Sequence, residues 1–124
     1  MPYNKDILYM SRAIELARKG RYGAHPNPMV GAVLVKNGRV IGEGWHKEFG
    51  KAHAEVNAIR SAGMAAAGST LYVTLEPCST RGKTGPCTEA VMGAGVKRVV
   101  IGAADPNPAN SGKAAFFGDN FLLL

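Results

Sequence analysis

The residues best suited to chemistry in this sequence are one histidine, one glutamate and two cysteines. His53 and Glu55 lie two residues apart, and Cys78 and Cys87 follow later, each directly after a proline. An imidazole and two thiolates are good zinc ligands, and three protein ligands leave a fourth position for water. A structural zinc site normally fills all four positions with side chains, so this count predicts a catalytic Zn²⁺ site.

The local context of these ligands supports the zinc hypothesis. His53 and Cys87 both stand where a helix is predicted to begin, and a thiol at a helix N-terminus ionises more easily. Two thiolates and a neutral imidazole would balance the charge of the metal, and a bound water would yield hydroxide near neutral pH. One alternative stays open, since His25 or His46 could supply a fourth ligand.

Glu55 is the candidate general base and acid. A carboxylate two residues from a ligand is close enough to take a proton from the attacking water and to deliver it to a departing amine. Positions i and i+2 of an ideal helix point roughly 200° apart. Both side chains must therefore come from a first turn that surrounds the metal.

The hydrophobic pattern predicts a three-layer α/β domain with a mixed sheet. Asn37-Gly38, between two apolar runs, is a strong hairpin signal and makes the first two strands antiparallel neighbours. A later strand, helix and strand predict a parallel crossover. The expected helices cover 5–19, 53–62 and 87 to about 93–95, and the expected strands cover 29–35, 40–41, 70–75 and 99–103.

The two ends of the chain differ in their hydrophobic pattern. The first helix has an apolar face built from Ile7, Met10, Ile14 and Ala17. The C-terminal segment from 110 to 124 has no clear pattern, and its last four residues could form a short edge strand or an unpacked apolar tail.

Length and composition narrow the class of protein. The 124 residues fit one compact domain, and 46% hydrophobic with 19% charged residues argues against disorder. The longest apolar runs are too short to cross a membrane, and no secretion signal opens the chain, so we expect a cytoplasmic protein. The net charge of +6 favours an anionic partner, either a phosphorylated small molecule or nucleic acid.

The His-x-Glu and Pro-Cys motifs form the signature of zinc deaminases, but here eight residues separate the two cysteines. This long spacing resembles the zinc loop of the pyrimidine deaminases of riboflavin biosynthesis. The resemblance covers roughly residues 7 to 112. The motifs that carry it, in family order, are Pro-Asn-Pro-Met-Val-Gly at 26–31, Gly-Glu-Gly-Trp-His at 42–46, His-Ala-Glu-Val at 53–56, the segment 74–87 and Asp-Pro-Asn-Pro at 105–108.

The resemblance implies a cytidine-deaminase-like α/β/α fold and hydrolytic removal of an exocyclic amine from a phosphoribosylated diaminopyrimidinone. It implies that His53, Cys78 and Cys87 bind zinc and that Glu55 moves the proton. It also implies a homo-oligomer, either a dimer or a tetramer. The residues at positions similar to the family's substrate contacts are Asn27, His46, Lys83, Asp105 and Asn107.

The chain departs from the family pattern in three places. Thr80 stands where the family usually has histidine, and Gly85 stands where proline is common. The residues after Lys113 do not follow the family pattern. The family's frequent second domain, a reductase, does not fit in the remaining length, so we expect residues 1–124 to form a single deaminase domain.

Two other functions stay open from the sequence alone. The first is a deaminase for another nucleotide, a nucleobase or a tRNA adenosine. The wide cysteine spacing and the lack of an aromatic-rich stacking platform argue against RNA, so nucleic acid is not the expected partner. The second, from a different class, is a non-catalytic zinc module with a basic nucleic-acid-binding face, which the three-ligand count and Glu55 disfavour.

Overall fold

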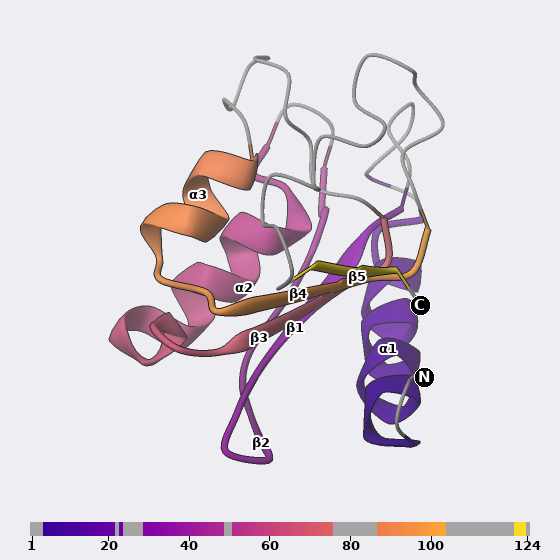
Figure 1. The fold of residues 1–124 in the computed structure, drawn as a ribbon. Helices are drawn as coiled ribbons and strands as arrows, with labels where there is room; N and C mark the ends of the chain where they lie inside the picture. Colours follow the sequence, from indigo (N-terminus) through magenta and orange to yellow (C-terminus); the bar gives the residue numbers. More distant parts are fainter. Residues whose placement is uncertain are drawn as a thin grey trace.

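A five-stranded mixed sheet forms the centre of the fold (Figure 1), in the order β2-β1-β3-β4-β5. The computed structural model describes residues 4–21, 23, 29–48, 51–75, 87–103 and 121–123. β1 pairs antiparallel with β2 and β3, whereas the β3–β4 and β4–β5 pairs are parallel. The predicted mixed sheet is confirmed. The strands are β1 (Gly31–Lys36), β2 (Arg39–Trp45), β3 (Thr70–Val73), β4 (Arg98–Ile101) and β5 (Phe121–Leu123).

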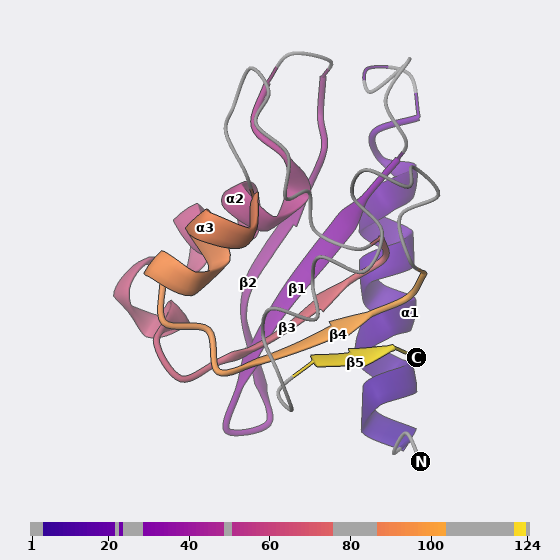
Figure 2. The same ribbon diagram turned by 45° about the horizontal axis from the view of Figure 1, so that its top comes forward.

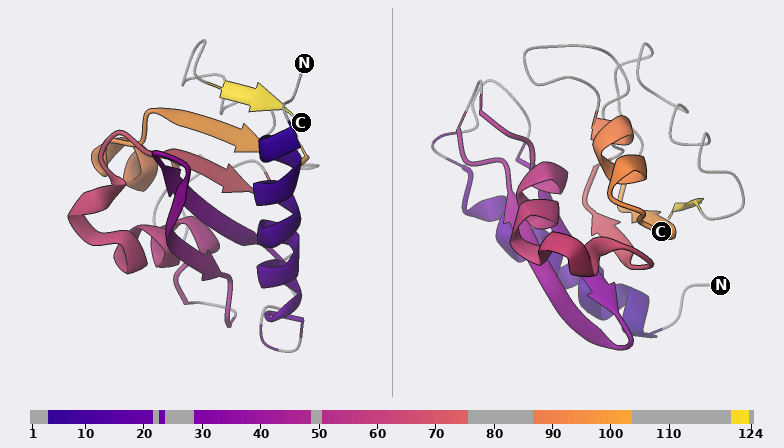
Figure 3. Two further views of the ribbon diagram at one scale, coloured as in Figure 1. Left: turned by 90° about the horizontal axis from the view of Figure 1, so that it is seen from below. Right: turned by 90° about the vertical axis from the view of Figure 1, so that its left-hand side faces the viewer.

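Helices cover both faces of this sheet and complete the predicted three layers. α1 (Asn4–Arg18) lies on one face, and α2 (Ala54–Ala62) and α3 (Cys87–Gly93) lie on the other (Figure 3). A 3₁₀ turn, η1 (Gly63–Ala66), follows α2 and was not expected from the sequence. Two hydrophobic clusters, one under α1 and one under α2 and α3, are separated by the sheet.

The hairpin between β1 and β2 forms as its turn residues predict. Asn37 and Gly38 both have positive φ, 53° and 75°, which is the geometry of the two-residue turn that matches strand twist. β1 itself is buried along most of its length, as expected for a central strand. It begins at Gly31, two residues later than the apolar run, and Met29 remains 48% exposed.

The C-terminal apolar residues form a strand. β5 lies parallel to β4 at the edge of the sheet (Figure 2). Of the two possibilities left open by the sequence, the edge strand is therefore the correct one.

The predicted apolar face of α1 is partly wrong. Met10 and Ala17 are buried as predicted, but Ile7 and Ile14 are 51% and 43% exposed. Ala13 and Leu16 complete the face that packs on the sheet. The two isoleucines are exposed because the buried face of the helix begins with a polar residue. A prediction based on apolar residues alone does not include that residue.

That polar residue is Asp6, which is only 3% exposed. Its carboxylate accepts a hydrogen bond from the Tyr72 hydroxyl at 2.5 Å and two from the Arg98 guanidinium at 3.1 and 3.2 Å. Asp6 lies in the first turn of α1, where the helix dipole also favours a negative charge. These contacts join α1 to β3 and β4 and determine which face of the helix is buried.

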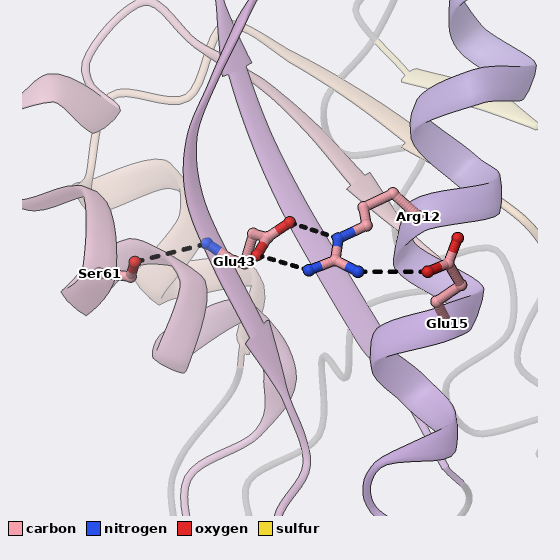
Figure 4. A network of polar contacts seen from close by, with 4 residues as sticks. All are labelled: Arg12, Glu15, Glu43 and Ser61. Atoms are coloured by element: carbon pink, nitrogen blue, oxygen red, sulfur yellow. Dashed lines mark hydrogen bonds and ion pairs between the residues drawn. The ribbon is translucent and has the colours of Figure 1, made fainter.

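A second polar contact joins α1 to β2. The Arg12 guanidinium donates to both carboxylate oxygens of Glu43, at 2.6 and 3.0 Å, and also donates to Glu15 (Figure 4). The Glu43 backbone N–H donates to the Ser61 hydroxyl on α2. β2 is therefore connected by polar contacts to a helix on each face of the sheet.

Candidate active site

The sheet topology brings several element ends to one edge. β2, β3 and β4 run in the same direction, because β2 and β3 are both antiparallel to β1 and β4 is parallel to β3. Their carboxyl ends therefore share the edge at which β1 begins. In α/β sheets, ligands bind in the crevice outside the carboxyl ends of the strands. This edge is the candidate active site.

α2 reaches this edge by lying unusually close to β2. A Cβ on Gly44 would stand 2.4 Å from the Ala58 backbone nitrogen and 2.5 Å from the Ala54 carbonyl oxygen. A Cβ on Gly42 would stand 2.5 Å from the Ala58 carbonyl oxygen. The two glycines point at α2 from alternate positions of the strand, so they set its distance from the sheet. In the sequence both glycines belong to the Gly-Glu-Gly-Trp-His motif, which does not show this packing role.

We predict that Gly44→Ala moves α2 and lowers activity at least about 10-fold, since a small misplacement of catalytic groups is costly. The added methyl group should also destabilise the fold by about 1–3 kcal/mol through overpacking. Gly93→Ala is the matched control, because no heavy atom lies within 4 Å of its Cβ position. Steady-state kinetics and thermal melts of both variants test this, and equal behaviour of the two would show that close packing at Gly44 is unimportant.

His53 and Glu55 lie at the start of α2, as predicted. His53 is the N-cap residue, with extended backbone (φ −75°, ψ 169°), and its side chain makes no capping hydrogen bond. Glu55 is in the first turn and is 3% exposed. Because His53 precedes the helix, the angle of roughly 200° between positions i and i+2 of a helix does not apply to this pair. A histidine and a buried carboxylate therefore occupy adjacent places at one helix start.

The His46 ring is in direct contact with His53. It follows β2, is 2% exposed, and its ring meets the His53 ring edge-on with 4.9 Å between centroids. Its Nδ1 lies 3.2 Å from the Ala52 carbonyl oxygen. Burial, and then the neighbouring His46, lower the pKa of His53. A lowered pKa favours the neutral imidazole that a metal requires.

Asn57 is a positioning residue that the sequence did not single out. Its side-chain amide donates to the carbonyl oxygens of Trp45 and Ala52, at 2.9 and 3.3 Å. It thereby ties the segment between β2 and α2, which leads to His53, back onto α2. In the sequence it resembles any polar helix residue, so no pattern could have identified it.

α3 begins at Cys87, as predicted. It contacts α2 and packs on the same face of the sheet, and in Figure 1 both helices begin near the upper end of the molecule. The Cys87 side chain lies outside the part of the chain that the structure describes. The other predicted site residues that lie outside it are Asn27, Cys78, Lys83, Asp105 and Asn107, together with His25, Thr80 and Gly85.

The residues that the structure describes are compatible with the predicted zinc site. Within them, no group of three or more histidine, cysteine or acidic side chains is gathered, because two of the three predicted ligands are not among the described side chains. The part that is described has a histidine at a helix start, favoured in its neutral form, and a buried carboxylate two residues later. This is the donor and the acid that the predicted chemistry needs.

Comparison with known proteins identifies the family of this chain. Residues 3–103 match the family described as cytidine and deoxycytidylate deaminase zinc-binding region. The diaminohydroxyphosphoribosylamino-pyrimidine deaminase of Buchnera aphidicola (subsp. Schizaphis graminum) is 51% identical over 113 residues, 91% of this chain and 77% of that protein. Riboflavin biosynthesis protein RibD of Escherichia coli is 53% identical over 112 residues, 90% of this chain and 30% of RibD.

A solved structure of a related protein has the same fold. The structure of Acinetobacter baumannii RibD superposes with a TM-score of 0.91 at 48% identity, over 95% of this chain and 34% of that one. The chain thus spans about a third of the length of the RibD proteins and about three quarters of the Buchnera deaminase.

The fold and the residues at the start of α2 define a cytidine-deaminase-like domain, one of the zinc-dependent hydrolases that deaminate pyrimidines. Within that class the chain belongs to the diaminohydroxyphosphoribosylaminopyrimidine deaminases of riboflavin biosynthesis. The family resemblance seen in the sequence motifs is confirmed.

Proposed function

We propose that this chain hydrolyses the exocyclic amine of a phosphoribosylated diaminopyrimidinone, giving the aminouracil and ammonia in riboflavin biosynthesis. The observation that carries the proposal is the buried carboxylate of Glu55 in the first turn of α2, two residues after His53. Identity of 51% to a deaminase named for this substrate supports the choice among pyrimidine deaminases.

We propose that His53, Cys78 and Cys87 hold the zinc ion of this family. Zinc bound by them would acidify a water molecule enough to supply hydroxide near neutral pH. Glu55 would accept a proton from the attacking water and donate it to the departing amine. Its burial keeps bulk water away from the carboxylate, and the helix start keeps its side chain at the sheet edge.

We propose as substrate contacts the five residues that the family resemblance implies. His46 follows β2 and lies against His53. The other four lie outside the described residues, but in the sequence they stand beside elements that begin or end at the sheet edge: Asn27 precedes β1, Lys83 precedes α3, and Asp105 and Asn107 follow β4. A carboxamide can both donate to and accept from a pyrimidinone edge, and a lysine is a suitable point charge for the 5′-phosphate.

The test is ammonia release by the zinc-loaded chain with three substrates in parallel. We expect turnover of the diaminopyrimidinone ribosyl phosphate, and neither turnover of dCMP nor inosine formation in a tRNA anticodon stem-loop. Preferred turnover of dCMP or of the stem-loop adenosine would replace the proposed substrate. Loss of zinc on chelation should abolish ammonia release, and its return on adding zinc would exclude irreversible unfolding.

Lys83→Ala tests the assignment of the phosphate contact. A hydrogen bond to a charged group contributes about 1.5–3 kcal/mol, so kcat/KM for the phosphorylated substrate should fall at least about 10-fold. The dephosphorylated substrate should be nearly unaffected. Lys97→Ala, at an exposed lysine just before β4, is the control. Equal losses on both substrates would mean that Lys83 does not bind the phosphate.

The remaining predictions concern the whole protein. Self-association as a dimer or tetramer and the single-domain organisation of residues 1–124 stay predictions, as does the cytoplasmic location. Among the described helices, none has the length and apolar character needed to cross a membrane.

A further inference from the structure

Two lysines converge on one tryptophan at the end of β2. The Nζ atoms of Lys19 and Lys47 lie 4.8 and 4.7 Å from the centroid of the Trp45 ring. Lys19 follows the last turn of α1, and Lys47 lies two residues beyond β2. Each ammonium is attracted by the indole ring. The two distances to one centroid mean that the two Nζ atoms are at most about 9.5 Å apart, where like charges still repel each other weakly. We call these three residues the Lys19–Trp45–Lys47 cluster.

The two segments that carry the lysines are held tightly together. A Cβ on Gly20 would stand 2.2 Å from the His46 carbonyl oxygen, and a Cβ on Gly23 would stand 2.1 Å from the Lys47 carbonyl oxygen. The turn after α1 therefore lies flat against the backbone that follows β2. The backbone positions from which the two lysines extend are fixed by this contact, so both side chains start close together at the end of β2.

The surroundings of the cluster are positively charged. Arg21 and Lys51 are exposed on the same two segments, and Arg18 is exposed at the end of α1. The exposed acids nearby in the described chain are Glu48 and, one turn before Lys19, Glu15, which is paired with Arg12. A further acid, Glu43, is near enough for Lys19 to contribute to its lowered pKa. The carboxylate of Glu43 is, however, already bound by the Arg12 guanidinium through both oxygens.

The cluster lies on the other face of the sheet from the candidate active site. Trp45 packs against the hydrophobic cluster under α1, whereas the next residue, His46, contacts His53 at the start of α2. α1 and α2 lie on opposite faces of the sheet, which explains this separation. A ligand bound at the cluster would thus be distinct from the substrate in the candidate active site.

We propose that the Lys19–Trp45–Lys47 cluster binds a phosphate group, carried by a small phosphorylated molecule or by a polynucleotide backbone. A phosphate has several acceptor oxygens and can take hydrogen bonds from both ammonium groups at once. It would thereby remove their mutual repulsion, and it would draw the ammonium groups away from the indole ring.

Trp45 provides a direct measurement, because it is the one tryptophan in the 124 residues. Titration of the zinc-loaded chain with inorganic pyrophosphate should change the indole fluorescence saturably at constant ionic strength. Lys19→Ala with Lys47→Ala should weaken this binding about 10-fold, as expected for two exposed charge contacts. Lys97→Ala should leave it unchanged, and Trp45→Phe should remove the signal.

A second arm identifies the source of the phosphate. Tighter binding of a single-stranded RNA oligonucleotide than of pyrophosphate, at equal phosphate concentration, indicates a polynucleotide, and equal or weaker binding indicates a small molecule. The proposal is overturned if pyrophosphate causes no saturable change, or if the double lysine variant binds it as the wild type does. It is also overturned if Lys83→Ala alone abolishes the change, since the signal would then come from the candidate active site.

Discussion

Replacing Glu55 by glutamine is expected to lower kcat about 10²–10⁴-fold, the usual contribution of a positioned general acid and base. The amide has nearly the same shape as the carboxylate but cannot accept the proton of the attacking water. Glu55 is 3% exposed in the first turn of α2, so bulk water has little access to substitute for it. Ammonia release under saturating substrate measures the effect.

The zinc content of the same preparation separates chemistry from metal binding. Glu55→Gln should keep about one zinc per chain, because the proposed ligands are His53, Cys78 and Cys87. Glu55→Asp should show partial activity, since the carboxylate is retained but withdrawn by one methylene. Activity of Glu55→Gln within about 10-fold of wild type, a loss too small for proton transfer, would remove Glu55 from the mechanism.

The start of α2 shows how far the sequence could predict the site. The residue pattern of 53–62 was enough to place His53 and Glu55 at a helix start, and the structure has both there. The pattern could not show that His53 is the N-cap with extended backbone, so that the angle between two helical positions does not apply to this pair. Backbone conformation at a cap depends on the chain that leads into it.

The short distance between α2 and the sheet could not be predicted from the sequence. Gly42 and Gly44 stand two residues apart in one strand, which indicates only that another segment packs closely on the strand backbone. In the structure that segment is α2, which makes the contact through Ala54 and Ala58. A helix packed this closely requires small residues on both elements, and that pairing becomes visible only when the two segments are known to face each other.

The orientation of α1 could not be predicted for a related reason. The hydrophobic pattern weighs Ile7 and Ile14 heavily and ignores Asp6. In the fold, Asp6 binds Tyr72 and Arg98, which are 66 and 92 residues away in the chain. No local pattern contains such partners, so the exposed isoleucines are a consequence of long-range polar pairing.

That pairing leads to the largest expected change in stability. Asp6→Ala should destabilise the fold by about 2–4 kcal/mol, because it removes the acceptor of the hydrogen bonds from the buried Tyr72 hydroxyl and from Arg98. The Asp6 side chain is 4% exposed, whereas that of Arg98 is 33% exposed, so water can partly solvate the guanidinium that is left. Urea denaturation of the variant measures the loss. Arg98→Met with Asp6→Leu should recover part of it, because an apolar pair leaves no unpaired guanidinium behind.

Arg12→Ala is the matched control for this prediction. The Arg12–Glu43 pair also joins α1 to the sheet through two hydrogen bonds, but its side chains are 38% and 32% exposed. Exposed pairs contribute about 0–1 kcal/mol, so this variant should lose far less stability than Asp6→Ala. Equal losses would mean that attachment of α1, rather than burial of the charge, determines the cost.

The pH dependence of unfolding gives an independent measurement of the same network. Burial, and then the hydrogen bond to Asp6, raise the pKa of Tyr72 from 10.0 to about 12. The unfolded chain therefore loses this proton at lower pH than the folded one, so stability from Tyr72 is complete below pH 10 and falls as the pH rises towards 12. Tyr72→Phe has no hydroxyl to titrate and should flatten this decline. A decline of the same steepness in that variant would show that other groups cause it.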